Sequence, residues 1–133
     1  MTDRVVPITD SESAPYWEAA ANGRLVVKGC RDCGARHWYP RAHCPRCGSP
    51  ETEWVHSAGR GRIHSYTTIH RAQQASFRDR VPYTLALVDL DEGPRILGFL
   101  DGGAGVTVGT AVTAGFEPVG DTALVSFRVD TGD

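Results

Sequence analysis

The chain has 133 residues, which is enough for one ordinary domain or two very small ones. Its composition, 41% hydrophobic and 23% charged, is typical of a globular protein, and no apolar run of 18 residues is present, which excludes a membrane-spanning helix. The net charge is −2 and the N-terminus lacks the apolar stretch of a signal peptide, so we expect a soluble, cytoplasmic protein with no membrane partner.

The charges are unevenly distributed along the chain. Residues 21–80 carry eleven Lys and Arg against four Asp and Glu, whereas residues 81–133 carry two against eight. A basic first half suggests an anionic partner, such as nucleic acid, a phosphate-bearing cofactor or an acidic protein face. The alternative is that these arginines are simply solvated.

The first predicted element is a short helix over about Pro15–Ala21. Its N-cap would lie at Ser13–Ala14 and its end at Asn22–Gly23. A helix this short is not stable alone. We therefore expect Tyr16 and Trp17 to dock it on the rest of the protein or on a partner.

Two Cys-x-x-Cys pairs follow a predicted strand, RLVVKGC, and are separated by ten residues. Together they hold all four cysteines of the chain: Cys30, Cys33, Cys44 and Cys47. Zn²⁺ prefers four such ligands in a tetrahedron, and the Gly after each pair lets the backbone turn toward the sulfurs. The spacing predicts a Cys₄ zinc ribbon rather than two disulfides, which a reducing cytoplasm disfavours. Iron in a rubredoxin-like site has the same ligand set, so Fe is not excluded.

Two histidines lie close to the cysteines and could replace one of them as a ligand. With four cysteines present, His37 and His43 are better interpreted as neighbours of the site or as surface residues. A closed Cys₄ shell leaves no open position for water. We therefore expect a structural metal that supplies folding energy to a segment too small to have its own core.

From Gly59 onward the sequence predicts only strands. The five candidates are GRGRIHSYTTIHRA, VPYTLALVDL, RILGFL, AVTAGFEPV and ALVSFRV. Short, evenly spaced strands favour a small barrel, because closure removes exposed edges. We expect a mainly β protein with a short N-terminal helix, a Cys₄ zinc ribbon and a five-stranded OB-type barrel, although an SH3-like barrel gives a similar pattern. The expected divisions are an arm and helix (1–22), the ribbon (23–56) and the barrel (57–133).

Alternation in the first barrel strand predicts which side chains share a face. One face would carry Ile63, Ser65, Thr67 and Ile69, and the other His64, Tyr66, Thr68 and His70. The second face could line a site, although a half-exposed barrel face explains it equally well. The next strand, VPYTLALVDL, is more continuously apolar, as expected of a strand buried on both faces.

The sequence contains no recognisable catalytic set. It lacks G-x-S-x-G, H-E-x-x-H, a P-loop and a dinucleotide-binding fingerprint. Asp89, Asp91 and Glu92 fall where a hairpin tip is predicted, and acidic residues are ordinary turn formers there. Whether the chain is an enzyme is left open, and activity of the chain by itself is not expected.

The order of these features resembles a family of small proteins long catalogued as a domain of unknown function. The resemblance covers about residues 14–129. It includes LVVKGCRDCG, YPRAHCPRCGS, the Trp and Gly-x-Gly of EWVHSAGRGRIHSY, and the pattern P-Y-x-x-A-L-V-x-L-x-E-G. The resemblance implies an N-terminal helix, a rubredoxin-like zinc ribbon and a C-terminal OB fold.

The resemblance also implies a role in acyl-CoA metabolism. Members are associated with thiolase-like enzymes as accessory subunits, among them acetoacetyl-CoA thiolase with hydroxymethylglutaryl-CoA synthase. Others are associated with lipid-transfer-protein-like thiolases and aldolases that shorten steroid side chains, or with hot-dog-fold enoyl-CoA hydratases. We therefore expect a non-catalytic subunit that docks on such an enzyme, in a heterotetramer, and supports acyl-CoA binding or turnover in steroid side-chain or fatty-acyl degradation.

Several arginines and aromatic residues are candidates for contact with CoA or with the partner. Planar guanidinium groups bind phosphates bidentately, which suits the phosphates of CoA. The candidates are Arg36, Trp38, Tyr39, Arg41, Arg46, Arg60, Arg62 and Arg71, with Tyr16 and Trp17 on the docking helix.

The alternative function is single-stranded nucleic-acid binding, which zinc ribbons and OB folds both serve. Against it, the whole-chain pI is about 6.2 and the barrel sequence from Val81 onward is acidic. The barrel sequence also shows no evident ladder of aromatic residues on which bases could stack.

Overall fold

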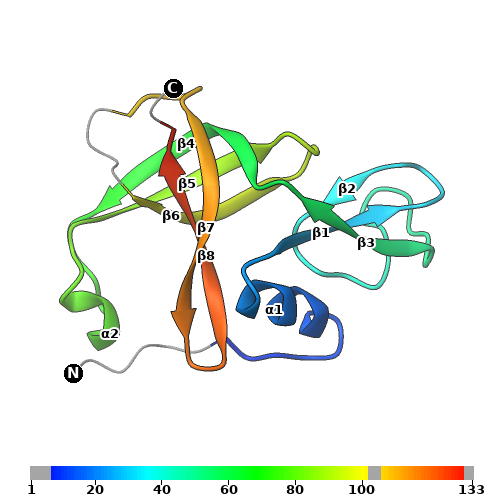
Figure 1. Ribbon diagram of the computed structural model, residues 1–133, viewed down its shortest axis with the longest axis horizontal. Coiled ribbons are helices and arrows are strands. Elements are labelled where there is room, and N and C mark those ends of the chain that lie inside the picture. Colours follow the sequence, from blue (N-terminus) through cyan, green and yellow to red (C-terminus); the bar gives the residue numbers. More distant parts are fainter. Residues whose placement is uncertain (1–6, 102–105, 131–133) are drawn as a thin grey trace.

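The structure of the protein is a computed structural model that describes residues 7–101 and 106–130. Figure 1 shows a small three-stranded ribbon on one side, a five-stranded barrel on the other, and a helix beneath the place where they meet. Within the described residues, no helix has the length and apolar character needed to cross a membrane.

Helix α1 (Ala14–Ala21) begins where the sequence predicts. Ser13 is its N-cap and Pro15 lies in its first turn, while Asn22 is its C-cap. The carboxylate of Asp10 accepts hydrogen bonds from the backbone N–H and the hydroxyl of Ser13, both at 2.8 Å. This turn fixes the direction in which the chain enters the helix.

The ribbon sheet consists of β1 (Leu25–Cys30), β2 (Arg36–His37) and β3 (Thr52–Ser57). Both outer strands pair antiparallel with β1, in the order β2-β1-β3. The two Cys-x-x-Cys turns therefore lie at the end of β1 and in the segment between β2 and β3.

Five strands close the barrel in the order β4-β5-β6-β8-β7. Their bounds are β4 (Arg60–Ile69), β5 (Tyr83–Leu90), β6 (Arg95–Asp101), β7 (Ala111–Val119) and β8 (Thr122–Val129). All neighbours are antiparallel except β6 and β8, which are parallel. The expectation of a mainly β, five-stranded OB-type barrel is confirmed, and the long loop after β4 contains a short helix, α2 (Ala75–Arg78).

The predicted alternation along β4 is wrong beyond Ile63. The pairing with β5 shifts between Ile63 and Ser65, which is a β-bulge at His64. After the bulge Tyr66 pairs with the buried Ala86, so Tyr66 and not Ser65 lies on the side of Ile63. His64 and Tyr66 therefore do not share a face, because one extra residue reverses a period of two.

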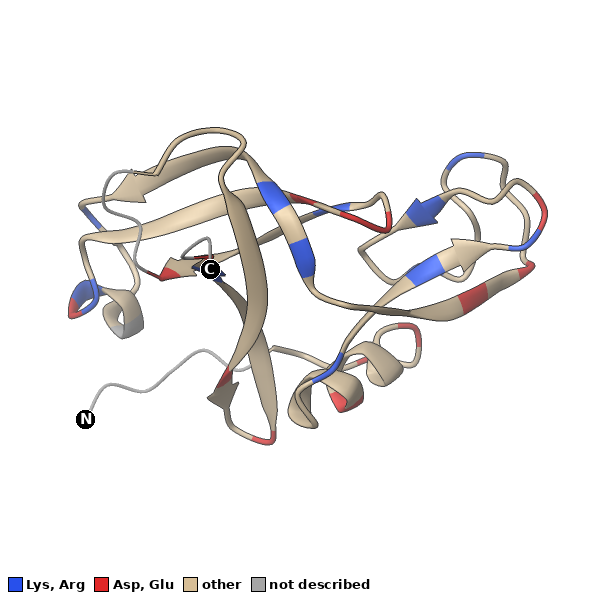
Figure 2. Cartoon of the chain, turned by 45° about the horizontal axis from the view of Figure 1, so that its top comes forward, with Lys and Arg blue, Asp and Glu red and all other residues tan. Residues whose placement is uncertain are grey.

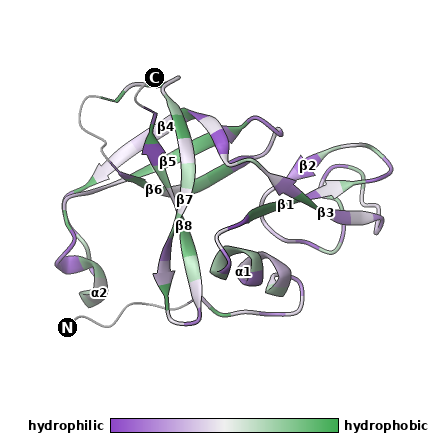
Figure 3. Ribbon diagram, in the orientation of Figure 1, coloured by the Kyte–Doolittle hydropathy of each residue, from purple (hydrophilic) through white to green (hydrophobic). Residues whose placement is uncertain are grey.

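The expectation that β5 is buried on both faces is also wrong. Ala86, Val88 and Leu90 point into the barrel and are buried, whereas Leu85 and Leu87 between them are only half-buried. Figure 3 shows hydrophobic colour along β5 and β6, and hydrophilic colour on ribbon strands β2 and β3.

One hydrophobic core joins the three parts of the chain. Tyr16 of α1 and Val27 of β1 belong to the same buried cluster as Val88, Ile96 and Phe127 of the barrel. The helix and ribbon are thus packed on the barrel rather than tethered to it. The relative positions of metal site, helix and barrel wall follow from this shared core.

Candidate functional site: a cysteine cluster beside an aromatic groove

The four cysteines meet in one cluster at the end of the ribbon. Their sulfur atoms all lie within 4.8 Å of one another, and the Cys30–Cys47 and Cys33–Cys44 sulfur distances are both 3.6 Å. A tetrahedron with metal–sulfur bonds of about 2.3 Å has edges of about 3.8 Å. A disulfide requires about 2.05 Å, and all four thiols are free. The cluster is therefore arranged to hold a metal ion.

Backbone N–H groups point at the sulfurs, as the glycine after each pair predicts. The N–H of Cys33 lies 3.5 Å from the sulfur of Cys30, and that of Arg46 lies 3.4 Å from the sulfur of Cys44. Gly34 and Gly48 have φ of +78° and +80°, which favours glycine at these turns.

The thiols influence each other's ionisation. Hydrogen bonds from the backbone of Cys47 and then of Arg46 lower the pKa of Cys44 to about 6. The backbone N–H of Ser49 favours the Cys47 thiolate, but the neighbouring thiols and burial outweigh it and raise the pKa of Cys47 to about 12. Such mutual repulsion among crowded sulfurs is what a cation relieves.

Neither histidine of the ribbon belongs to the cluster, whose members are the four cysteines. His37 lies on β2 opposite Lys28, and burial lowers the pKa of His37, with Lys28 and Arg41 adding to this effect. His43 is exposed beside Cys44.

A contact that the sequence did not predict joins the ribbon to the barrel. The carboxylate of Glu92, in the β5–β6 hairpin, accepts hydrogen bonds from the Ser57 hydroxyl at 2.7 Å and the Ala58 N–H at 3.0 Å. Arg36 also reaches the Glu92 carbonyl at 3.5 Å. The sequence signal was the E-G of the quoted family pattern, which we had interpreted as an ordinary turn. We call this contact the Glu92 latch.

The candidate arginines do not converge on one site. Arg36 and Arg46 line an open hollow of about 550 Å³ between the cysteine turns and the β5–β6 hairpin, next to Glu92. Arg60 and Arg62 are exposed at the beginning of β4, and Arg62 bonds the carbonyl of Gly109 at 3.0 Å.

Arg71 lies beyond the far end of β4. A ten-residue strand is about 30 Å long, so Arg71 is not beside the ribbon as the sequence interpretation had placed it. Figure 2 shows basic positions spread over the ribbon and the adjoining part of the barrel rather than gathered in one groove.

The candidate aromatic residues differ in exposure. Tyr16 is 4% exposed and belongs to the core, so it is not available to a partner as the sequence interpretation had suggested. Burial also raises the pKa of Tyr16. Trp17 and Trp38 are half-buried, whereas Tyr39 is 59% exposed.

These residues line two adjoining cavities that we call the aromatic groove. The first, of about 240 Å³, lies against the outer wall of the barrel and is lined by Tyr16, Trp17, Trp38, Leu85, Leu97, Gly98, Phe99, Leu124 and Val125. The second, of about 270 Å³, shares Tyr16, Trp17 and Trp38 and continues to Pro7, Ile8, Ser13, Tyr39 and Pro40. The sequence signal was RILGFL, which is apolar on both faces of a strand.

Three further aromatic rings gather where the groove meets α2. Phe77, Tyr83 and Phe99 lie with ring centroids 5.7 to 6.2 Å apart. The guanidinium of Arg80 lies 4.7 Å from the Phe99 ring and forms an ion pair with Glu117 at 3.3 Å. This cluster contrasts with the expectation that the barrel lacks grouped aromatic residues, although its rings pack on one another.

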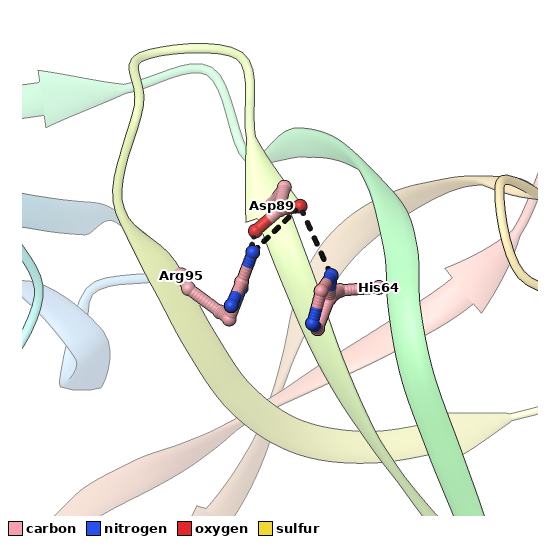
Figure 4. A network of polar contacts seen from close by, with 3 residues as sticks. All are labelled: His64, Asp89 and Arg95. Atoms are coloured by element: carbon pink, nitrogen blue, oxygen red, sulfur yellow. Dashed lines mark hydrogen bonds and ion pairs between the residues drawn. The ribbon is translucent and has the colours of Figure 1, made fainter.

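A polar network crosses three barrel strands on the outer face. Arg95 of β6 donates to Asp89 of β5 at 2.6 Å, and His64 of β4 lies 3.6 Å from the other Asp89 oxygen (Figure 4). The hydrogen bond from Arg95 lowers the pKa of Asp89. Asp89 thus lies within β5 and not at the hairpin tip. In the part of the chain that the structure describes, no hydroxyl or thiol is hydrogen-bonded to His64.

Family models match both parts of this architecture. Residues 17–53 match the rubredoxin-like zinc ribbon domain of ChsH2, and residues 54–117 match the C-terminal OB-fold domain of ChsH2. A chain of the Ltp2-ChsH2(DUF35) aldolase superposes with a TM-score of 0.81 at 31% identity, covering 93% of this chain and 98% of that one. The chain belongs to this family of zinc-ribbon and OB-fold proteins, known as ChsH2 or DUF35 proteins.

Curated relatives extend the comparison. The chain is 31% identical over 126 residues to the 3-oxo-4,17-pregnadiene-20-carboxyl-CoA hydratase alpha subunit of Mycobacterium tuberculosis, covering 93% of this chain and 40% of that protein. It is 33% identical over 91 residues to the benzoylsuccinyl-CoA thiolase subunit BbsA of Thauera aromatica, covering 66% and 61%. The chain spans about half or less of the length of the first curated relatives that it matches.

Proposed function

We propose that this chain is a non-catalytic accessory subunit of a thiolase-like enzyme, of the thiolase or aldolase type, that acts on acyl-CoA. The observation that carries the proposal is the match to a chain of the Ltp2-ChsH2(DUF35) aldolase, which extends through helix, ribbon and barrel alike. The resemblance to a thiolase subunit supports the same role.

The metal in this proposal is Zn²⁺ with a structural role. Cys30, Cys33, Cys44 and Cys47 would hold it, and the match to a zinc ribbon supports Zn²⁺ over Fe. The ion would cancel the repulsion among the thiolates and hold the two cysteine turns together. A closed shell of four sulfurs leaves the chemistry of the reaction to the partner.

The assembly in this proposal is a cytoplasmic heterotetramer, since thiolase-like enzymes are dimers and each protomer would carry one copy of this chain. Its parts are the arm and helix (1–22), the ribbon (23–56) and the barrel (57–133). The acyl group could be a steroid side chain, because one relative is a hydratase subunit for a pregnadiene carboxyl-CoA.

Two groups of exposed arginines are placed to meet the phosphates of CoA at the edge of the partner's site. One is Arg36 with Arg46 in the hollow beside the cysteine turns, and the other is Arg60 with Arg62 on β4. Because these two groups flank the Glu92 latch, a partner that covers the ribbon–barrel junction would contact both. Arg71 is not part of this surface.

The direct test is co-purification. The full chain, tagged and expressed in its native cells, is purified gently and the bound proteins are identified by mass spectrometry. We expect one thiolase-like subunit in equimolar amount. A preparation that carries single-stranded nucleic acid instead, with salt-dependent affinity for an oligonucleotide, would replace this proposal by the nucleic-acid alternative.

A further inference from the structure

The aromatic groove is an apolar hollow on the outside of a barrel, where a polar surface is expected. Its first cavity is walled by Leu97 and Phe99, which alternate with the buried Ile96, Gly98 and Leu100 along β6. Leu97 is 43% exposed. Together the two cavities reach the lower part of the 300 to 1,000 Å³ range of small-molecule pockets, and such pockets are lined mainly by apolar and aromatic side chains.

The two ends of the groove differ in charge. At the α2 end, Phe99 meets Arg80, whose guanidinium is already paired with Glu117. At the other end, Tyr39 carries the guanidinium of Arg41 at 5.9 Å from its ring. Among the described residues no carboxylate lies within ion-pair distance of Arg41, and Glu12 contacts the hairpin through the N–H of Ala42 instead.

This combination matches an amphipathic anion. An apolar chain would fill the cavities from Tyr39 past Trp38 to Leu97 and Phe99, and a negatively charged head would lie at the unpaired Arg41. A protein segment would fill an apolar hollow equally well, but it would not account for a single free cation at one end and a neutralised one at the other.

We infer that the aromatic groove binds the hydrocarbon chain of an acyl ligand, with the anionic head of the ligand at Arg41. The inference rests on the proposed function in that it names the part of an acyl-CoA that this chain itself would hold. The same chemistry is shared by a free fatty carboxylate and by an acyl thioester with a phosphate-bearing head. Calorimetry distinguishes the two sources.

The experiment titrates the full, metal-loaded chain with decanoate, decanoyl-CoA, octanoyl-CoA and free CoA. Each methylene buried in an apolar site strengthens binding about fourfold, so decanoyl-CoA should bind roughly tenfold more tightly than octanoyl-CoA. Binding of decanoate and decanoyl-CoA alike assigns the head site to any anion. Binding of decanoyl-CoA alone assigns it to the thioester form.

Variants identify the groove as the site. Leu97→Glu places a carboxylate against the apolar wall and should weaken decanoyl-CoA binding about tenfold or more. Val108→Glu is the matched control, because Val108 is 66% exposed on the barrel away from the groove. Arg41→Gln should weaken binding of every acylated probe by about fivefold, the loss of one charge-assisted contact. Metal content and circular dichroism check that each variant is folded.

Two results would overturn the inference: no binding of any acylated probe, or equal binding by the wild type, Leu97→Glu and Val108→Glu chains. Co-purification of the partner is measured on the same variants. If Leu97→Glu loses the partner and the wild type binds no acyl probe, the groove is a protein-docking surface and the proposed function stands. If the wild type binds decanoyl-CoA but no thiolase-like partner co-purifies, the inference stands and the proposed function fails.

Discussion

At the scale of single residues, the cysteines act together and not as independent thiols. Their sulfurs lie at distances suited to one ion, with N–H groups of Cys33 and Arg46 directed at them. Cys47→Ser should therefore abolish stoichiometric metal binding and destabilise the protein by about 4 kcal/mol or more, the range for loss of a structural metal. Metal analysis and thermal unfolding measure the two effects.

His43→Ala is the control for this variant, since His43 is exposed next to Cys44 and lies outside the cluster. It should keep one metal per chain and unfold as the wild type does. If Cys47→Ser kept its metal while His43→Ala lost it, the ligand set would include a histidine and the Cys₄ description would be wrong.

A second residue-scale prediction concerns Gly61. A Cβ atom at this position would clash with the Asp89 carbonyl oxygen and lie 2.7 Å from the Val88 side chain across the β4–β5 pair. Gly61→Ala should cost about 1 to 3 kcal/mol, as overpacking does. Gly115→Ala, where the added atom meets only the Ser126 hydroxyl at 3.8 Å, should be nearly neutral in the same denaturant titration. Equal stability of the two variants would contradict the close approach.

At the scale of elements, the Glu92 latch decides how the β5–β6 hairpin sits on the ribbon. Burial raises the pKa of Glu92, but hydrogen bonds from Ala58 and Ser57 outweigh it, so the pKa lies below its usual value of 4.5. A carboxylate whose pKa is lowered by folding stabilises the protein above its unfolded pKa. This stabilisation is lost as the pH falls through the folded pKa.

Glu92→Gln should therefore lower stability by about 1 kcal/mol at pH 7, after allowance for solvent screening. The difference from the wild type should vanish as the pH falls below 4.5. Thermal unfolding of both proteins from pH 7 to pH 3 measures this, with Asp91→Asn, an exposed neighbour, as control. A difference that stayed constant over the whole range would show that the Glu92 charge does not act through the latch.

Local patterns were sufficient to predict most of these elements. The cysteine spacing, the Ser13 cap and the five barrel strands each depend on residues close in sequence. The bulge at His64 could not be seen, because the apolar and hydroxyl residues around it continue an apparent period of two. The latch joins Glu92 to Ser57, 35 residues away, and pairing of that kind depends on how the barrel closes.

At the scale of the whole molecule, helix, ribbon and barrel share one core through Tyr16, Val27 and Phe127. The aromatic groove exists only because these parts meet, and for that reason sequence patterns named Trp17 and Trp38 but not the Leu97 and Phe99 wall opposite them. The same packing means that the metal should stabilise more than the ribbon that holds it.

Removal of the metal with a chelator should consequently lower the melting temperature of the entire chain in a single transition. Loss of a ligand that binds only the folded state lowers stability by several kcal/mol when binding is tight. Near-UV circular dichroism of the barrel aromatic residues follows this directly. A barrel transition that kept its temperature after chelation would indicate two independent units.

The central claim is that the chain supports the activity of a thiolase-like enzyme. The measurement that tests it is turnover of acyl-CoA by the co-purified enzyme, separated from this chain and then reconstituted with it. The account predicts that the separated enzyme loses about tenfold or more of its activity, that equimolar addition restores it, and that the chain alone shows none. Equal activity of the enzyme with and without the chain would contradict the account.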